Sequence, residues 1–137
     1  MDIAGDEVGS ADLVIEAIVE KVDAKRDLLV ALSPKLSADA IVATNTSSIR
    51  LEELADALER PGRFVGLHFF NPVASLPLVE VVRGAGTDEA TEQRALAFVA
   101  QIGKVPLPCG SAPGFVVNRV LMPYMIEALR AHQDGLP

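Results

Sequence analysis

The chain has 137 residues and a net charge of −7, with 50% hydrophobic and 23% charged residues, which is typical of an ordinary globular domain and excludes a disordered tail. The acidic balance and the aromatic content of 4% argue against a nucleic-acid partner, which needs clustered basic residues or stacking rings. One cysteine excludes a disulfide scaffold, and no apolar run approaches the roughly 18 residues that cross a bilayer, so we expect no membrane span and a cytoplasmic location.

Strands and helices alternate in the first half of the chain. Residues 13–18 are mostly apolar and branched, which predicts a buried parallel strand. Asp23 is the expected N-cap of a following helix that carries leucines at helical spacing. Residues 40–44 predict a second buried strand, and the polar sequence NTSS then leads to a short amphipathic helix over 51–58.

The second half continues the alternation after one exception. Residues 64–70 and 76–82 predict two successive strands, and Thr87 is the expected cap of a helix that ends before Gly103. A short strand over 105–108 and a helix over 115–132 complete the chain. This order of elements predicts an α/β fold.

The exception is the connection between strands 64–70 and 76–82, which is too short for a helical crossover and therefore predicts an antiparallel hairpin. A turn centred near Ala74 places His68 directly opposite Glu80 on one face of the sheet. A carboxylate there can accept from one imidazole nitrogen and leave the other as a base. The alternative is a structural His–Glu pair at a strand end.

Polar residues at other element ends are further candidates. The NTSS loop, residues 45–48, follows a parallel strand, where open α/β sheets bind ligands, although such residues also serve as loops and helix caps. Glu20 and Lys25 follow the first strand at the same edge and could face ribose hydroxyls and an anion, or form an exposed charge pair. Asn118, which opens the last helix, could donate to a substrate oxygen or cap the helix.

A glycine-rich dinucleotide fingerprint is missing. Gly84-Ala85-Gly86 lies between a strand and a helix, but the third glycine of G-x-G-x-x-G would fall at Glu89, whose carboxylate would repel a pyrophosphate. We therefore interpret this segment as a turn. The His and Cys residues also lack metal-ligand spacing, so we expect no metal site.

Five motifs together resemble the L-3-hydroxyacyl-CoA dehydrogenase family, in wording closest to the dehydrogenase part of bacterial multifunctional fatty-acid oxidation proteins. In chain order they are NTSS, GLHFFNPV, LPLVEVVRG, GKVPL and PGFVVNRVLMPY. The resemblance implies an oxidoreductase of fatty-acid beta-oxidation, which uses NAD to oxidise an L-3-hydroxyacyl-CoA to the 3-ketoacyl-CoA. The implied substrate is an acyl-CoA.

The resemblance also implies roles for particular residues. His68 matches the family's catalytic base, and Glu80 matches its dyad partner. Ser47 matches a serine near the nicotinamide and the substrate hydroxyl, and Asn118 matches an asparagine that hydrogen-bonds substrate. The remaining matches are to cofactor-contacting positions: Ile18, Val19 and Glu20 along the ribose, Lys25 near the bound nucleotides, and Asn71 beside the base.

The implied domain organisation cuts across the family's fold. Residues 1–111 match the C-terminal half of a Rossmann-type NAD-binding domain with a β-hairpin, and residues 112–137 match the first helix of an all-α domain. The family's glycine-rich turn and dimerising helices are not matched, so we expect this chain alone to bind NAD weakly and to be inactive. The alternative is a non-enzymatic remnant that acts as an interaction module, pairing with itself as a homodimer or with a complementing fragment.

Overall fold

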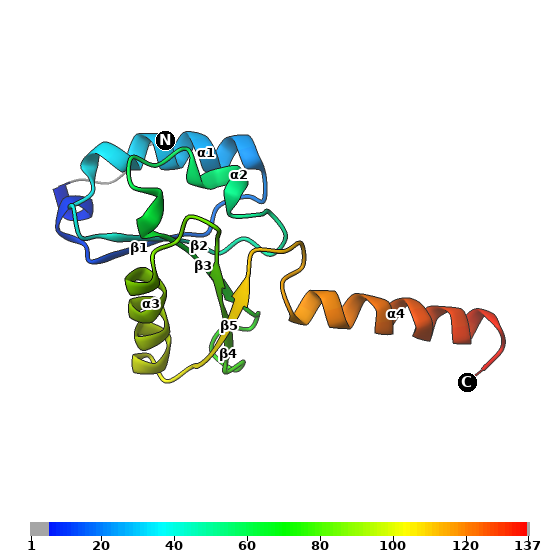
Figure 1. Cartoon of the computed structure of the whole chain (residues 1–137). Helices are drawn as coiled ribbons and strands as arrows, with labels where there is room; N and C mark the ends of the chain where they lie inside the picture. The colour runs from blue at the N-terminus through cyan, green and yellow to red at the C-terminus, as the bar shows by residue number, and fades with distance from the viewer. Residues whose placement is uncertain (1–5, 137) are drawn as a thin grey trace.

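The computed structural model describes residues 6–136, in which a five-stranded sheet has helices on both faces (Figure 1). The strands follow chain order across the sheet, and every neighbouring pair is parallel except β3 and β4. Their bounds are Leu13–Glu16 (β1), Ile41–Thr44 (β2), Phe64–Phe69 (β3), Leu78–Arg83 (β4) and Val105–Gly110 (β5). The predicted α/β class and antiparallel hairpin are both confirmed.

Four α-helices and three short 3-10 helices precede, connect or follow these strands in the described residues. The α-helices are Val22–Leu32 (α1), Glu52–Ala55 (α2), Glu89–Gln101 (α3) and Val117–Gln133 (α4). The 3-10 helices are Asp6–Ser10, Ser33–Lys35 and Pro61–Arg63. Pro34, in the second of these, ends the α-helical conformation after α1 because proline has no N–H to continue it.

Two predicted caps and one predicted burial are wrong. The N-cap of α1 is Lys21, and Asp23 lies in its first turn. The N-cap position of α3 is Asp88, without a side-chain cap bond, and the Thr87 hydroxyl donates instead to the carbonyl of Phe64 at 2.7 Å. Among residues 6–136, strand β1 pairs with β2 alone, so it is an edge strand, and its Ile15 is 38% exposed.

Alternating strand residues form two hydrophobic cores, one on each face of the sheet. Phe64 and Val82 pack with the residues of α1 and α2, whereas Val65 and Leu67 pack with those of α3. Successive strand residues point to opposite faces, so His68 and Glu80 share the face of Phe64 and Val82. The hairpin therefore presents both side chains toward the layer that contains α1 and α2.

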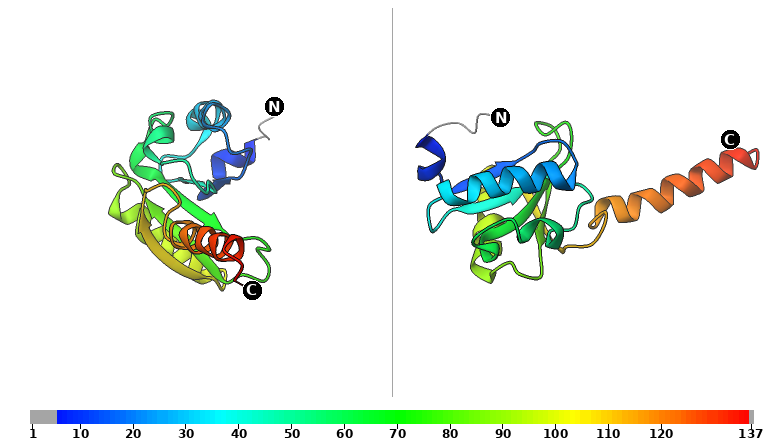
Figure 2. Two further views of the ribbon diagram at one scale, coloured as in Figure 1. Left: turned by 90° about the vertical axis from the view of Figure 1, so that its right-hand side faces the viewer. Right: turned by 90° about the horizontal axis from the view of Figure 1, so that it is seen from above.

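Helix α4 leads away from the sheet instead of covering it (Figures 1 and 2). Many of its large apolar side chains are exposed: Val120, Leu121, Met122, Tyr124, Met125, Ile126 and Leu129. Within residues 6–136 we find no helix with the length and apolarity that a bilayer-spanning segment requires. The exposed apolar side chains of α4 thus form a surface that no other part of residues 6–136 covers.

Candidate active site

The hairpin brings His68 and Glu80 together in the predicted register. The two residues are direct partners across β3 and β4, and Nδ1 of His68 lies 2.7 Å from Oε2 of Glu80. Both are buried, with Glu80 0% and His68 7% exposed. A carboxylate only accepts hydrogen bonds, so Nδ1 carries the proton toward Glu80 and Nε2 keeps its lone pair.

Two aromatic rings hold the imidazole from the sides. The ring centroid of Phe70 lies 4.5 Å from that of His68, and the ring of Phe115 lies 5.7 Å away. Phe70 follows directly after β3, whereas Phe115 comes from the segment before α4 and is itself buried. Together with the Glu80 bond, these contacts restrict rotation of the imidazole.

The NTSS loop is held by one carboxylate, that of Glu20. Its Oε1 accepts from the Thr46 hydroxyl at 2.6 Å and from the backbone amides of Ser47 and Ser48 at 2.8 and 3.1 Å. Burial by itself raises the pKa of Glu20, but these hydrogen bonds and the nearby Lys25 outweigh it and lower the pKa to about 2. Glu20 is thus ionised at neutral pH and fixes the loop after β2.

Lys25 lies beneath this loop and not on the surface. Its ammonium is 0% exposed, binds Glu16 at 2.9 Å and lies 3.5 Å from Glu20. Glu16 also accepts a short hydrogen bond from Thr44, and the carbonyl of Ile18 accepts from Lys25 at 3.3 Å. The interpretation of Glu20 and Lys25 as an exposed charge pair is therefore wrong, because Lys25 is needed to neutralise a buried carboxylate.

Asn45 connects the NTSS loop to the strand that carries His68. Its side-chain oxygen accepts from the backbone amide of Phe69 at 2.9 Å. The loop and the dyad are thus neighbours at one edge of the sheet. Among the other predicted residues, Asn71 is exposed in the β3–β4 connection, and Asn118 lies in the first turn of α4.

Several residues of the site escaped the sequence reasoning. Glu16 had a usable signal, because an acid inside an apolar strand needs a buried cation, and Lys25 follows nine residues later. Asn45 and Phe115 had none, since their contacts depend on how distant segments meet in the fold. The same holds for the backbone amides of Val116 and Val117, which donate to Glu80.

A dinucleotide fits part of this edge of the sheet. Exposed Val19 and half-exposed Glu20 follow the carboxyl end of β1, and Ser47 follows that of β2. Val19 offers an apolar surface that suits an aromatic ring, and Glu20 and Ser47 offer hydrogen-bonding groups that suit a ribose. A pyrophosphate cradle is not evident: in residues 6–136 no glycine-rich turn opens a helix, and the first turn of α3 is acidic. No group of three potential metal ligands occurs in the same residues.

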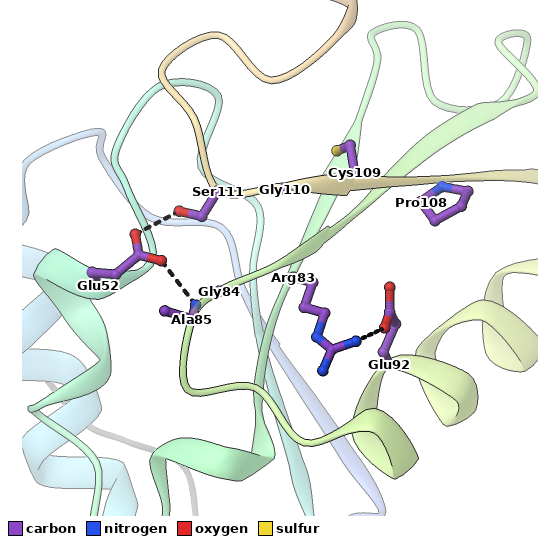
Figure 3. A pocket seen from close by; sticks show the side chains of 9 residues that line it. All are labelled: Glu52, Arg83, Gly84, Ala85, Glu92, Pro108, Cys109, Gly110 and Ser111. Carbon is purple, nitrogen blue, oxygen red and sulfur yellow. Dashed lines mark hydrogen bonds and ion pairs between the residues drawn. The ribbon is translucent and has the colours of Figure 1, made fainter.

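A separate hollow of about 470 Å³ lies at the C-terminal ends of β4 and β5 (Figure 3). Its charged side chains already have partners. Arg83 binds Glu92 at 3.0 Å, and Glu52 accepts from the Ser111 hydroxyl at 2.8 Å and from the amide of Ala85 at 3.0 Å. These bonds tie three segments together, so we assign the hollow a structural role and not a ligand site.

Comparison with known proteins gives a consistent result. Residues 2–112 match the family model described as 3-hydroxyacyl-CoA dehydrogenase, NAD binding domain. A probable 3-hydroxyacyl-CoA dehydrogenase of Caenorhabditis elegans is 46% identical over 95% of this chain and 42% of its own length. A mitochondrial hydroxyacyl-coenzyme A dehydrogenase of Rattus norvegicus is 45% identical over 93% of this chain and 41% of its own.

Solved structures agree with the sequence relatives. The 3-hydroxybutyryl-CoA dehydrogenase of Escherichia coli K12 superposes with a TM-score of 0.93 at 40% identity, over 99% of this chain and 28% of its own. The chain therefore spans well under half the length of the curated relatives and of this structure. These similarities cover the sheet, the hairpin and the loops that surround His68.

Proposed function

The chain belongs to the 3-hydroxyacyl-CoA dehydrogenase family through its NAD-binding domain, and on that premise we propose that it serves the NAD-dependent oxidation of an L-3-hydroxyacyl-CoA to the 3-ketoacyl-CoA. The observation that carries the proposal is the buried contact of 2.7 Å between His68 and Glu80 on opposed strands. We further propose fatty-acid beta-oxidation as the setting. The substrate is then an acyl-CoA.

His68 is the proposed base of this reaction. Its Nε2, free of the Glu80 bond, accepts the proton of the substrate hydroxyl while Glu80 balances the positive charge that builds on the imidazole. NAD, when bound, supplies the hydride acceptor. General-base catalysis of this kind contributes about 10²–10⁴-fold to the rate. The fixed imidazole adds to this because the base is already oriented before substrate arrives.

The neighbouring loops are the proposed cofactor and substrate contacts. Ile18, Val19 and Glu20 would line the ribose, and Asn71 would contact the cofactor beside the base. Ser47 would serve both the nicotinamide and the substrate hydroxyl, and Asn118 would bind substrate. Lys25 would lie near the bound nucleotide without touching it, because its buried ammonium binds Glu16 and Glu20. Its contribution would be to hold the Glu20 carboxylate in position.

The wider setting of the chain is also part of the proposal. We propose residues 1–111 as the NAD-binding part and residues 112–137, with α4, as the beginning of a helical part. A single cysteine suits a reducing compartment such as the cytoplasm, although the rat relative carries a mitochondrial name.

The experiment uses a chimaera, because this chain covers 28% of the E. coli relative. Residues 6–136 replace the matching segment of that protein, and NADH formation is followed with L- and D-3-hydroxybutyryl-CoA. We expect turnover of the L-enantiomer only. A folded chimaera that binds NAD but oxidises neither enantiomer would contradict the proposal. In parallel, we expect a calorimetric titration of the 137-residue chain with NAD to show weak binding.

A second candidate is a non-enzymatic role in self-association. Two observations favour it: the unpaired edge of β1, and the apolar side chains that α4 exposes. Sedimentation of the 137-residue chain over a range of concentrations separates the candidates. A stable homodimer that does not bind NAD supports self-association. A monomeric 137-residue chain, together with turnover by the chimaera, supports the dehydrogenase.

A further inference from the structure

The carboxylate of Glu80 has a second set of partners besides His68. Its Oε1 accepts from the backbone amides of Val116 and Val117, each at 2.8 Å. These amides lie at the N-terminus of α4, where helical N–H groups have no partner within the helix and the helix dipole favours an anion. One buried carboxylate thus joins the imidazole of His68 to the first turn of a helix.

The backbone before α4 has the conformation that aims these amides at Glu80. Gly114 has φ of +76°, and Phe115 has φ of +45°, which is rare for a residue with a side chain. Such a strained conformation persists only where surrounding contacts hold it. Here the Phe115 side chain is 3% exposed and packs in the core beside His68, which supplies that hold.

The segment is fixed at its other end as well. The Ser111 hydroxyl donates to the Glu52 carboxylate at 2.8 Å (Figure 3). The same hydroxyl accepts from the amide of Leu51 at 2.9 Å, and the Ser111 amide donates to the carbonyl of Arg83 at 3.0 Å. Only a few residues separate this anchor from the amides on Glu80. The segment 111–117, which we call the linker, is therefore held at one end by the Glu52 carboxylate of α2 and at the other by the Glu80 carboxylate of β4.

We propose that the linker is a positioning element of the dyad, in which the amides of Val116 and Val117 hold Glu80 so that its other oxygen stays on Nδ1 of His68. This inference rests on the proposed function of His68 as a base. It gives Gly114 and Phe115 a purpose in the reaction without contact to substrate. It also means that a change in the orientation of α4 reaches His68 through Glu80.

The test compares glycines that share a conformation but not a location. Gly114→Val places a branched side chain where φ is +76° and should displace the amides, whereas Gly103→Val makes the same change at φ +75° behind α3. Gly114→Asn is the rescue variant, because asparagine tolerates this backbone region. All are made in the 137-residue chain with His132→Gln, so that His68 gives the only histidine signals.

Two NMR readouts report on the dyad and do not depend on activity. The first is the scalar coupling across the hydrogen bond between the Val117 amide nitrogen and the Glu80 carboxyl carbon. The second is the pair of imidazole nitrogen shifts, which distinguish the Nδ1–H form of His68 from the Nε2–H form. Failure of the chimaera to turn over would refute the proposed function and leave these readouts unaffected.

We expect Gly114→Val to lose the coupling and to mix the two imidazole forms, while Gly103→Val and Gly114→Asn keep both signatures of the parent. If Gly114→Val does not fold, Gly114→Ala is measured in the same way. The proposal is overturned if the Gly114 variant that folds retains the coupling and a pure Nδ1–H form. It is equally overturned if Gly103→Val loses them to the same extent.

Discussion

Two buried carboxylates organise two regions of this molecule in different ways. In the dyad region, around His68 and Glu80, the Glu80 carboxylate bonds to His68 on the neighbouring antiparallel strand and accepts two further hydrogen bonds from backbone amides of the linker. In the loop region, Glu16 binds Lys25 and Thr44 beneath the NTSS loop, and half-exposed Glu20 binds the loop itself. The first is aligned by strand register, and the second depends on a buried ion pair.

This difference predicts how each region fails. The strands still align His68 with Glu80 when one hydrogen bond is lost, so damage there should affect the orientation of the His68 imidazole more than the fold. In the loop region the β1–β2 register aligns Glu16 with Thr44, but the cation Lys25 comes from α1, and its removal leaves a carboxylate buried without a counter-charge. We therefore expect the loop region to control stability and the dyad region to control the chemistry.

The largest effect on stability is expected from Lys25→Met. It removes the cation that neutralises buried Glu16, and breaking a buried ion pair in this way costs about 3–5 kcal/mol. Denaturant unfolding of the 137-residue chain measures the loss, with exposed Lys21→Met as the matched control. Equal stability of the two variants would show that the ion pair does not support the fold.

A smaller loss is expected from Glu80→Gln, which keeps the shape of the side chain and removes its charge. The amides of Val116 and Val117 keep an acceptor, but the bond to His68 changes, and we expect a loss of about 1–3 kcal/mol. Exposed Glu59→Gln is the control. A loss as large as that of Lys25→Met would remove the contrast between the regions.

Acid should weaken the loop region through Glu20. Its pKa falls from 4.5 to about 2 on folding, so its contribution is complete above pH 4.5 and is lost as the pH falls through about 2. We expect Glu20→Gln to be less stable than the parent by about 1 kcal/mol near neutral pH, a value reduced for solvent exposure, and this difference to shrink on acidification. A difference independent of pH would contradict this role of Glu20.

The smallest effect concerns Cys109, which packs on the dyad side of the sheet. Burial, and then the nearby charge of Glu80, raise the pKa of its thiol to about 11. Little thiolate forms at neutral pH, so we expect slow alkylation of the folded chain and fast alkylation after unfolding. Rapid alkylation without loss of fold would show that this part of the dyad region opens readily.

The two regions also differ in how far the sequence predicted them. The length of the β3–β4 connection determined the register, and the pairing of His68 with Glu80 followed from counting residues. The burial of Lys25 did not follow, because its helix position looks exposed until the neighbouring strands are placed. The linker contacts were also hidden, since backbone amides carry no sequence signal and Phe115 adopts a rare backbone conformation.

The most direct test of the central claim, that His68 is the base, is kcat of the chimaera with His68→Gln beside His132→Gln. His132 lies exposed near the end of α4 and serves as the matched histidine. We predict that His68→Gln lowers kcat by about 10²–10⁴-fold and that His132→Gln leaves it unchanged. A His68→Gln chimaera with near-normal kcat would contradict the account.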